Sequence, residues 1–193
     1  MEEKNYFENS SLILIQNEVS VDALCKVITI AGEAGIEIIY NPAPARKMPW
    51  EIFKYINIMT PNETEAAILA GYDPAKPLKI NCVLKKLHEF GVKNVLITMG
   101  EKGSIVSTPN GVYQIKPLEG QVVSTTGAGD CYNAALAVKY AETKNILEAA
   151  QYASIASGLQ VQRSGVITNL PYKEEVDLIY EGMEGSMIEK VYF

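Results

Sequence analysis

Residues 122–141 read VVSTTGAGDCYNAALAVKYA, an apolar segment joined to a helix-forming one through a turn with two glycines. The first part resembles a strand, and the run that follows Asp130 consists of good helix formers. Gly127 and Gly129 allow a sharp turn and the close approach of another group. Asp130 is therefore expected near a helix N-terminus, where it could cap the helix or belong to a site for an anion.

Strand-like and helix-like segments alternate on the N-terminal side of this turn, up to about residue 100. The predicted strands are 11–16, 36–41, 56–59 and 94–99, and the predicted helices are 21–32, closed by Gly32, then 61–71 and 79–90. Such alternation predicts βαβ units and a parallel sheet with helices on both faces.

The pattern changes after residue 100. Residues 104–108 and 112–116, joined through P-N-G, predict a hairpin that adds an antiparallel edge to the sheet. The remaining predicted helices are 128–142, 146–162 and 173–181. Because no linker, repeat or low-complexity tract interrupts the chain, we expect one domain over residues 1–193, a mostly parallel three-layer α/β/α sheet.

The composition argues against several classes of partner. The net charge is −6 with no basic block, which disfavours nucleic acid and anionic membrane surfaces. No apolar run reaches the length of a membrane span. Cys25, Cys82 and Cys131 are far apart and favour neither a disulfide framework nor a zinc site, so we expect a reducing, cytoplasmic setting. The single histidine, His88, is expected on the surface, so a general base would be a carboxylate.

In the segment T-P-N-E-T-E, some residues are explained by helix capping and others are not. Thr60 is the expected N-cap of a helix, Pro61 suits its first position and Glu63 would complete a capping box. Asn62 and Glu65 are left over and share one face at the carboxyl end of a strand, where ligands of α/β sheets bind. They are either two solvated polar residues or a carboxylate that holds Mg²⁺ through water, assisted by an amide.

Two glycine-rich turns could bind phosphates or a flat ligand. Thr98 and Gly100 end the predicted strand 94–99, although this turn could equally have no role in binding. At the second turn, N–H groups of residues 127–130 would converge at a helix start and stabilise an anion in transfer between two oxygens. The carboxylate of Asp130 could accept the proton of an attacking hydroxyl, or Asp130 could be an ordinary cap.

Taken in order, these segments resemble the ribokinase-like (PfkB) sugar kinases, from about residue 11 to about residue 176. The similar segments are I-Y-N-P-A-P-A (39–45), T-P-N-E-T-E (60–65), T-M-G-E-K-G (98–103), T-T-G-A-G-D (125–130) and L-P-Y-K-E-E-V (170–176). The run N-P-A-P-A is more typical of the ribokinase branch than of fructokinases or nucleoside kinases.

The resemblance implies ATP-dependent phosphorylation of a sugar hydroxyl, with Mg²⁺ on the phosphates and D-ribose as the first candidate sugar. It implies that Asp130 is the catalytic base and that Gly127, Ala128 and Gly129 form the anion hole. Asn62 and Glu65 match the family's N-x-x-E pair, which serves phosphate and metal. The other residues implied to contact the nucleotide are Thr98, Met99, Gly100, Glu101, Lys102, Gly103, Gly129, Asp130 and Ser154, the last standing where ribokinases often have Asn.

The resemblance also concerns the sugar and a monovalent cation. Glu18, in L-I-Q-N-E, matches a carboxylate that contacts the sugar in ribokinases, although an acid at a helix start is an alternative explanation. Ser124 stands where the family usually has an Asp that binds K⁺, and a neutral ligand leaves K⁺ activation open. The other residues at the cation position are Thr126, Arg163, Gly165 and Asn169.

Family members begin with a segment that supplies a sugar-binding Gly-Gly-Asn run, central strands and a small β lid, and the resemblance starts after it. We therefore expect the C-terminal portion of such a kinase, with Met1 possible as an internal methionine. An apolar sheet edge would be exposed and could pair with a second copy, giving a homodimer, or with another chain. The hypotheses are a working kinase for sugar and ATP, a catalytically silent nucleotide-binding or partner-dependent fragment, and accidental motifs in a non-enzymatic protein.

Overall fold

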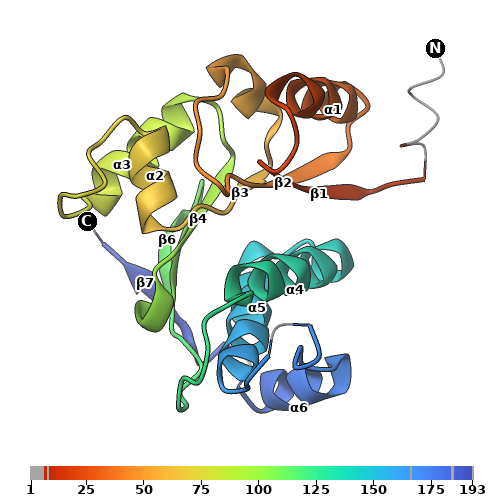
Figure 1. Cartoon of the computed structure of the whole chain (residues 1–193), viewed down its shortest axis with the longest axis vertical. Coiled ribbons are helices and arrows are strands. Elements are labelled where there is room, and N and C mark those ends of the chain that lie inside the picture. The colour runs from red at the N-terminus through yellow and green to blue at the C-terminus, as the bar shows by residue number, and fades with distance from the viewer. Residues whose placement is uncertain (1–6, 8, 166, 184, 193) are drawn as a thin grey trace. The chain divides into compact units, whose positions relative to one another are not determined.

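A computed structural model describes residues 7, 9–165, 167–183 and 185–192. Within these residues, seven strands form one mixed sheet in which the strand order follows the chain (Figure 1). The chain divides into two compact units. The first contains the residues up to Thr98 together with Ser107–Gly111, and the second contains Met99–Val106 and Val112–Tyr192. The expectation of a single domain stays a prediction.

The first unit consists of parallel strands and the helices between them. Its strands are β1 (Leu12–Gln16), β2 (Glu37–Asn41), β3 (Ile58–Met59) and β4 (Asn94–Thr98), and its helices are α1 (Val21–Glu33), α2 (Glu63–Leu69) and α3 (Ile80–Glu89). Each strand pairs in parallel with the next, for example Ile13 with Ile38 and Ile39 with Ile58. The alternation predicted from the sequence is therefore confirmed, because buried apolar strands and amphipathic helices carry distinct periodicities.

Three details of this unit differ from the prediction. Helix α1 continues past Gly32, and a side chain at Gly32 would collide with the ring of Tyr55, so this glycine provides space for packing and does not stop the helix. A 3₁₀ helix, η2 (Trp50–Tyr55), was not predicted. The expectation of a solvated His88 was wrong, since its two ring nitrogens lie 2.8 Å from the Val92 carbonyl oxygen and 2.8 Å from the Ser107 hydroxyl.

The second unit contains most of a hairpin, one further strand and three helices. Its elements are β5 (Ser104–Thr108, shared with the first unit), β6 (Gly111–Ile115), β7 (Ile188–Val191), α4 (Ala128–Thr143), α5 (Ile146–Val161) and α6 (Lys173–Met183). The predicted hairpin and helices are confirmed to within a few residues. Strand β7 was missed, and it pairs antiparallel with β6, so the last strand of the sheet is β7 and not part of the hairpin.

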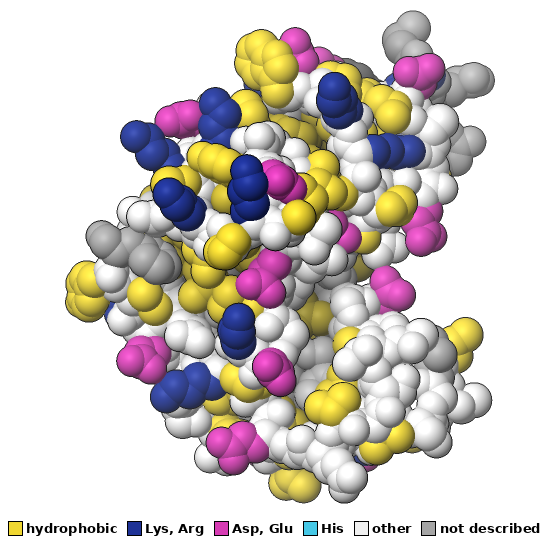
Figure 2. Space-filling model, turned by 60° about the vertical axis from the view of Figure 1, so that its left-hand side comes forward, with side chains coloured by type: hydrophobic (Ala, Val, Ile, Leu, Met, Phe, Trp, Pro, Cys, Tyr) yellow, Lys and Arg dark blue, Asp and Glu magenta, His cyan; other side chains and the backbone are white. Residues whose placement is uncertain are grey.

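The surface and helix lengths bear on the expected partners. On the face drawn in Figure 2, Lys and Arg side chains are interspersed with Asp and Glu side chains. In the part of the chain that the structure describes, no helix combines the length and the apolar character needed to cross a membrane. Cys25, Cys82 and Cys131 are all free thiols.

Candidate active site

The glycine turn at residues 127–130 opens helix α4. Gly127 is the N-cap, with φ 80° and ψ 0°, a left-handed conformation that a residue with a side chain adopts only at a cost. Its carbonyl accepts the N–H of Cys131 at 3.0 Å, and the N–H of Ala128 donates to the Thr125 carbonyl at 3.2 Å. The first N–H groups of a helix lack acceptors within the helix, and the helix dipole adds positive potential there. The turn therefore has the local geometry of an anion site.

Gly129 has no structural reason to be glycine. Its backbone is not left-handed, and among the described residues a Cβ placed here would meet no atom within 4 Å outside the local helix backbone. Its carbonyl is held by Asn133, whose Nδ2 donates to it at 2.8 Å and whose side chain is buried. Open space above a helix N-terminus is what the close approach of a phosphate requires.

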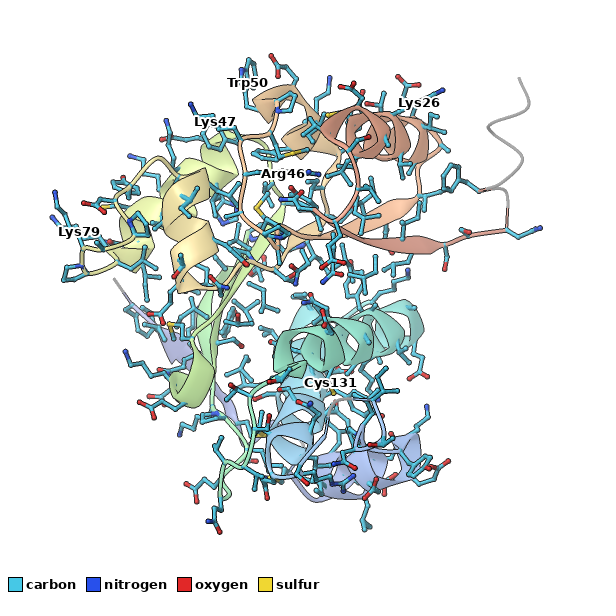
Figure 3. All side chains as sticks on the ribbon, viewed as in Figure 1. Lys26, Arg46, Lys47, Trp50, Lys79 and Cys131 are labelled. Atoms are coloured by element: carbon cyan, nitrogen blue, oxygen red, sulfur yellow. The ribbon has the colours of Figure 1, made fainter. Side chains whose placement is uncertain are left out.

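Asp130 lies in the first turn of α4 and is exposed, which confirms its predicted place near a helix N-terminus. The N-cap position itself belongs to Gly127, three residues earlier. The neighbouring Cys131 is buried (Figure 3), and burial raises the pKa of its thiol to about 11. At neutral pH the thiol is therefore protonated and a poor nucleophile.

The segment before the turn is a loop, and its prediction as a strand was wrong. Val122 and Val123 are 58% and 55% exposed. The N–H groups of Val123 and Ser124 donate to the Val161 carbonyl at 2.8 and 3.1 Å, so they bind the end of helix α5 instead of a strand ladder. The apolar side chains alone could not reveal this, because the segment finds its acceptor nearly forty residues further along the chain.

The five residues expected at a cation site are divided among separate interactions. Ser124 Oγ lies 3.4 Å from the Thr126 N–H as a turn acceptor. The guanidinium of Arg163 forms a bidentate pair with Glu175, and hydrogen bonds from Arg163 and then from the backbone of Tyr172 hold the pKa of Glu175 below its ordinary value.

Gly165 and Asn169 lie together, on the other hand. Gly165 has φ 118°, and a Cβ at this position would lie 2.6 Å from Asn169 Nδ2. The side chain of Asn169 therefore packs directly against the glycine. No group of three or more His, Cys, Asp or Glu side chains within the described ranges could hold a metal ion.

Asn62 and Glu65 in the first unit form the helix cap that the sequence pattern predicted at Thr60 and Glu63. Helix α2 begins after Asn62, not after Thr60. The side chain of Asn62 accepts the N–H of Glu65 at 2.9 Å, and Glu65 Oε2 accepts the N–H of Asn62 at 2.9 Å. The capping box is therefore Asn62–Glu65, and Asn is as good a cap as Thr. The Pro61 carbonyl accepts the N–H of Thr98, which keeps the chain extended as far as Asn62.

The nucleotide residues predicted at 98–103 form a tight turn. The N–H of Thr98 donates to the Pro61 carbonyl at 3.0 Å, and Thr98 forms a parallel bridge with Asn62, so these two predicted residues lie side by side. Residues Gly100–Lys102 form a 3₁₀ turn, η3, and the N–H of Met99 donates to the Gly103 carbonyl at 2.8 Å.

Ser154 lies elsewhere in the second unit, on helix α5. It is only 5% exposed, and its hydroxyl donates to the Lys116 carbonyl at 2.9 Å, just after β6. This hydrogen bond explains the presence of a serine at position 154 by structure alone. A contact with the nucleotide stays a prediction.

Glu18, predicted to contact the sugar, lies in the turn between β1 and α1 and is exposed. Ser20 caps helix α1, and the acid of its first turn is Asp22. Glu18 therefore precedes the cap, which removes the helix-start explanation for it. Arg46, labelled in Figure 3, donates from its guanidinium to the carbonyl of Val19 and ties this turn to the segment after β2.

The neighbouring Asn17 holds the same turn and was missed by the sequence analysis. Its Nδ2 donates to the carbonyls of Pro42 and Pro44 at 3.2 and 2.9 Å, and its Oδ1 accepts the hydroxyl of Tyr40 at 2.6 Å. Burial raises the pKa of Tyr40 to about 12, so the hydroxyl remains a donor. A polar residue at the end of an apolar strand, with N-P-A-P-A following the next strand, is the signal that could have identified this connection.

Two more residues next to the glycine turn carried little signal. Asn133 supports the Gly129 carbonyl from within α4, and Gln160 near the end of α5 donates to the Thr126 carbonyl at 2.8 Å. Each is a polar residue inside a helical pattern, where a buried amide cannot be distinguished from a solvated one until the neighbouring elements are placed.

Comparisons with known proteins agree with this arrangement. A model of the pfkB family of carbohydrate kinases matches residues 1–173. The chain is 37% identical over 174 residues to a bifunctional ribokinase/ribose-5-phosphate isomerase A of Fructilactobacillus sanfranciscensis, and 31% identical over 177 residues to a ribokinase of Staphylococcus aureus. The structure of Arabidopsis thaliana ribokinase complexed with ribose and ATP superposes with a TM-score of 0.85 at 31% identity, which confirms the expected α/β fold.

The similarity covers nearly all of this chain and only part of each relative. The matched region is 90% of the chain and 32% of the bifunctional protein, and 91% of the chain and 58% of the Staphylococcus ribokinase. The superposition covers 92% of the chain and 58% of the Arabidopsis enzyme.

Proposed function

The chain belongs to the pfkB family of carbohydrate kinases, and from this premise we propose that it transfers the γ-phosphate of ATP to a hydroxyl of a pentose. The first candidate reaction is D-ribose to ribose 5-phosphate, because the relatives named above are ribokinases. The observation that carries the proposal is the open space above Gly129, at the start of a helix whose first turn presents Asp130.

In the proposed reaction, the oxygen of a sugar hydroxyl attacks the γ-phosphorus while the bond from that phosphorus to the β,γ-bridging oxygen breaks. ADP leaves with the electron pair of that bond. Asp130 accepts the hydroxyl proton, and the N–H groups of Gly127, Ala128 and Gly129 stabilise the charge on the moving phosphoryl group. For this, the N–H of Ala128 would turn from the Thr125 carbonyl toward the phosphoryl group or be shared between them. Exposure of Asp130 and the lack of a side chain at Gly129 both favour access by the reactants.

The proposed ligands of the nucleotide are the residues of the two turns. Residues 98–103 would lie against the nucleotide, and Asn62 and Glu65 would serve its phosphates and a metal ion. Mg²⁺ bound to ATP keeps several waters and needs only one or two carboxylates, so a single carboxylate such as Glu65 fits it. When bound, Mg²⁺ would neutralise phosphate charge. Glu18, held by its strand-end turn, is the proposed sugar contact.

Gly129→Ala distinguishes an effect on phosphate binding from an effect on stability. Alanine is a better helix former than glycine, and the added methyl group meets no neighbour, so the free energy of unfolding should rise by about 0.5–1 kcal/mol. The methyl group would instead occupy the space proposed for phosphate, and ATP affinity measured by calorimetry should fall by at least about tenfold. Gly182→Ala, also in a helix with open space, is the matched control and should leave ATP affinity unchanged. Unchanged affinity in Gly129→Ala would contradict the site.

Glu65→Gln separates the metal role from the capping role. Glutamine can still accept the N–H of Asn62, so thermal unfolding should shift by no more than about 2 °C. Loss of the charge should raise the Mg²⁺ concentration needed for half-maximal ATP binding by roughly tenfold or more. Glu63→Gln removes a carboxylate from the same helical turn and should keep the wild-type Mg²⁺ titration. Equal Mg²⁺ titrations for the two variants would leave Glu65 with only its capping role.

A catalytically silent nucleotide-binding or partner-dependent fragment is the second candidate, favoured by the 58% coverage of the Staphylococcus ribokinase. The two candidates differ in ADP formation by the purified chain with Mg·ATP and D-ribose. Ribose-dependent ADP formation supports a working kinase. ATP binding without turnover, in a chain with a cooperative thermal transition, supports the silent fragment.

A further inference from the structure

Gln160 places a buried amide against the glycine turn. It lies at the penultimate position of helix α5, and its side chain is 0% exposed. Its Nε2 donates to the Thr126 carbonyl at 2.8 Å, and Thr126 directly precedes Gly127. Because a carbonyl accepts and cannot donate, the NH₂ group must be the end of the amide that faces it. The amide is therefore the electropositive partner of the carbonyl at the entrance to the turn.

Two more hydrogen bonds connect the same loop to the same helix end. The N–H groups of Val123 and Ser124 share the Val161 carbonyl. Together with the amide of Gln160 they attach residues 123–126 to the last turn of α5 through three hydrogen bonds. The chain itself thus holds the loop that positions the first glycine of the proposed phosphate site.

The other end of the Gln160 amide is unsatisfied. Over the described ranges, Oε1 is buried and has no hydrogen-bond donor within reach. The second buried glutamine of α5, Gln151, is a contrast, since its Nε2 donates to the Met183 carbonyl and its Oε1 accepts the N–H of Gly185. A buried acceptor without a donor destabilises the fold, so packing alone does not account for a glutamine at position 160.

The residues at the expected K⁺ position do not fit the ion. Carbonyl and carboxylate oxygens are suitable ligands for K⁺, and the Gln160 amide already takes one of the two lone pairs of the Thr126 carbonyl. Ser124 supplies a hydroxyl in place of a carboxylate, so no charge at that position would offset a cation. Arg163, three residues after Gln160, adds a positive charge to this segment, although Glu175 pairs with it.

We propose that the amide of Gln160 takes the place of the monovalent cation, so that the loop before the glycine turn keeps its conformation without K⁺. An N–H dipole aimed at the Thr126 carbonyl supplies the positive potential that an ion would supply. Substitution of the carboxylate position by Ser124 agrees with this, because an amide carries no net charge to balance. The proposal concerns the turn to which we assign phosphate binding, but its test requires neither ATP nor turnover.

The first test compares the thermal unfolding of the wild-type chain in KCl, NaCl and choline chloride at equal ionic strength. We expect the same Tm in all three salts to within about 1 °C. A cation held at about ten times its Kd would raise Tm by roughly 3–6 °C. A saturable rise of that size specific to K⁺ would overturn the proposal.

Gln160→Glu should create the cation requirement that the wild type lacks. The change keeps the shape of the side chain but turns a carboxylate oxygen toward the Thr126 carbonyl, where two acceptors need a cation between them. At a pH above 7 we expect a lower Tm in choline chloride and a recovery of about 3 °C or more in KCl. A folded variant that responds equally to both salts would count against the proposal.

Gln162→Glu is the matched control for the carboxylate itself. The amide of Gln162 also donates to a backbone carbonyl near the end of α5, that of Gly158 at 2.9 Å, away from Thr126. Its Tm should show no K⁺-specific recovery. If the Gln160→Glu chain fails to fold in every salt, the wild-type comparison still decides between an internal amide and a bound ion.

Discussion

Asp130→Asn is expected to lower ribose-dependent ADP formation by about 10²–10⁴-fold while ATP affinity stays within about threefold. Asparagine has the shape of aspartate but no basic oxygen for the hydroxyl proton. The N–H groups that we propose to bind the phosphoryl group belong to the backbone of the turn and survive the change. The measurement is a coupled assay of ADP together with calorimetric titration of Mg·ATP, since the two readouts separate proton transfer from binding.

Asp177→Asn is the control for Asp130→Asn. Asp177 is another carboxylate of the second unit, and its partner is the hydroxyl of Tyr152 on helix α5. We expect its turnover to remain near that of the wild type. If Asp130→Asn keeps full turnover, the assigned base is wrong. Loss of ATP binding together with turnover would instead point to a role of Asp130 in the nucleotide site.

Gly103→Ala is expected to have the largest effect on stability, a loss of about 4 kcal/mol or more. Gly103 has φ 81° and ψ −129°, a region open almost only to glycine. Its added Cβ would overlap the Ile115 carbonyl oxygen and lie 3.0 Å from the backbone nitrogen of Pro117. Ile115 pairs with Ile188 in the sheet, so the obstructing backbone cannot move aside easily. Thermal unfolding should shift downward by at least about 8 °C.

Gly100→Ala, in the same turn, tests whether the clash with the Ile115 carbonyl causes the loss of stability in Gly103→Ala. Gly100 also has a positive φ, 56°, but within the described ranges a Cβ there would meet no atom within 4 Å. Only the cost of the left-handed conformation applies, about 1–2 kcal/mol. The Tm of Gly103→Ala should therefore be clearly lower than that of Gly100→Ala. Equal shifts would show that the contact with Ile115 is relieved by local movement.

The candidate site could be predicted from the sequence wherever the residues of one short segment determine its local structure. Two glycines before a helical run predict a turn with N–H groups at a helix start, and α4 does begin one residue after Gly127. The T-P-N-E-T-E segment was harder, since Thr60 and Asn62 are both good caps with a glutamate three residues later. The structure selects Asn62, because the Pro61 carbonyl accepts the N–H of Thr98 and the chain stays extended as far as Asn62.

Hydrogen-bond partners that lie far apart in the sequence could not be predicted from local patterns. Val122 and Val123 are as apolar as strand residues, but Val123 finds its hydrogen-bond acceptor on helix α5. Strand β7 has two charged residues among its four, Glu189 and Lys190, so its apolar signal is weak until β6 presents an edge for it. In both segments the side chains are compatible with more than one environment, and the partner backbone decides.

The sequence by itself determined the order of strands and helices, the glycine turn with Asp130 at its helix, and the likeness to a family, since local periodicity and contiguous motifs carry each of these. Only the tertiary structure decided which polar side chains hold that turn. Gln160 and Thr126 are thirty-four residues apart, and their hydrogen bond exists because α4 and α5 pack together within the second unit. Burial then makes an unpartnered Gln160 oxygen costly, a fact that no residue type reveals until its surroundings are in place.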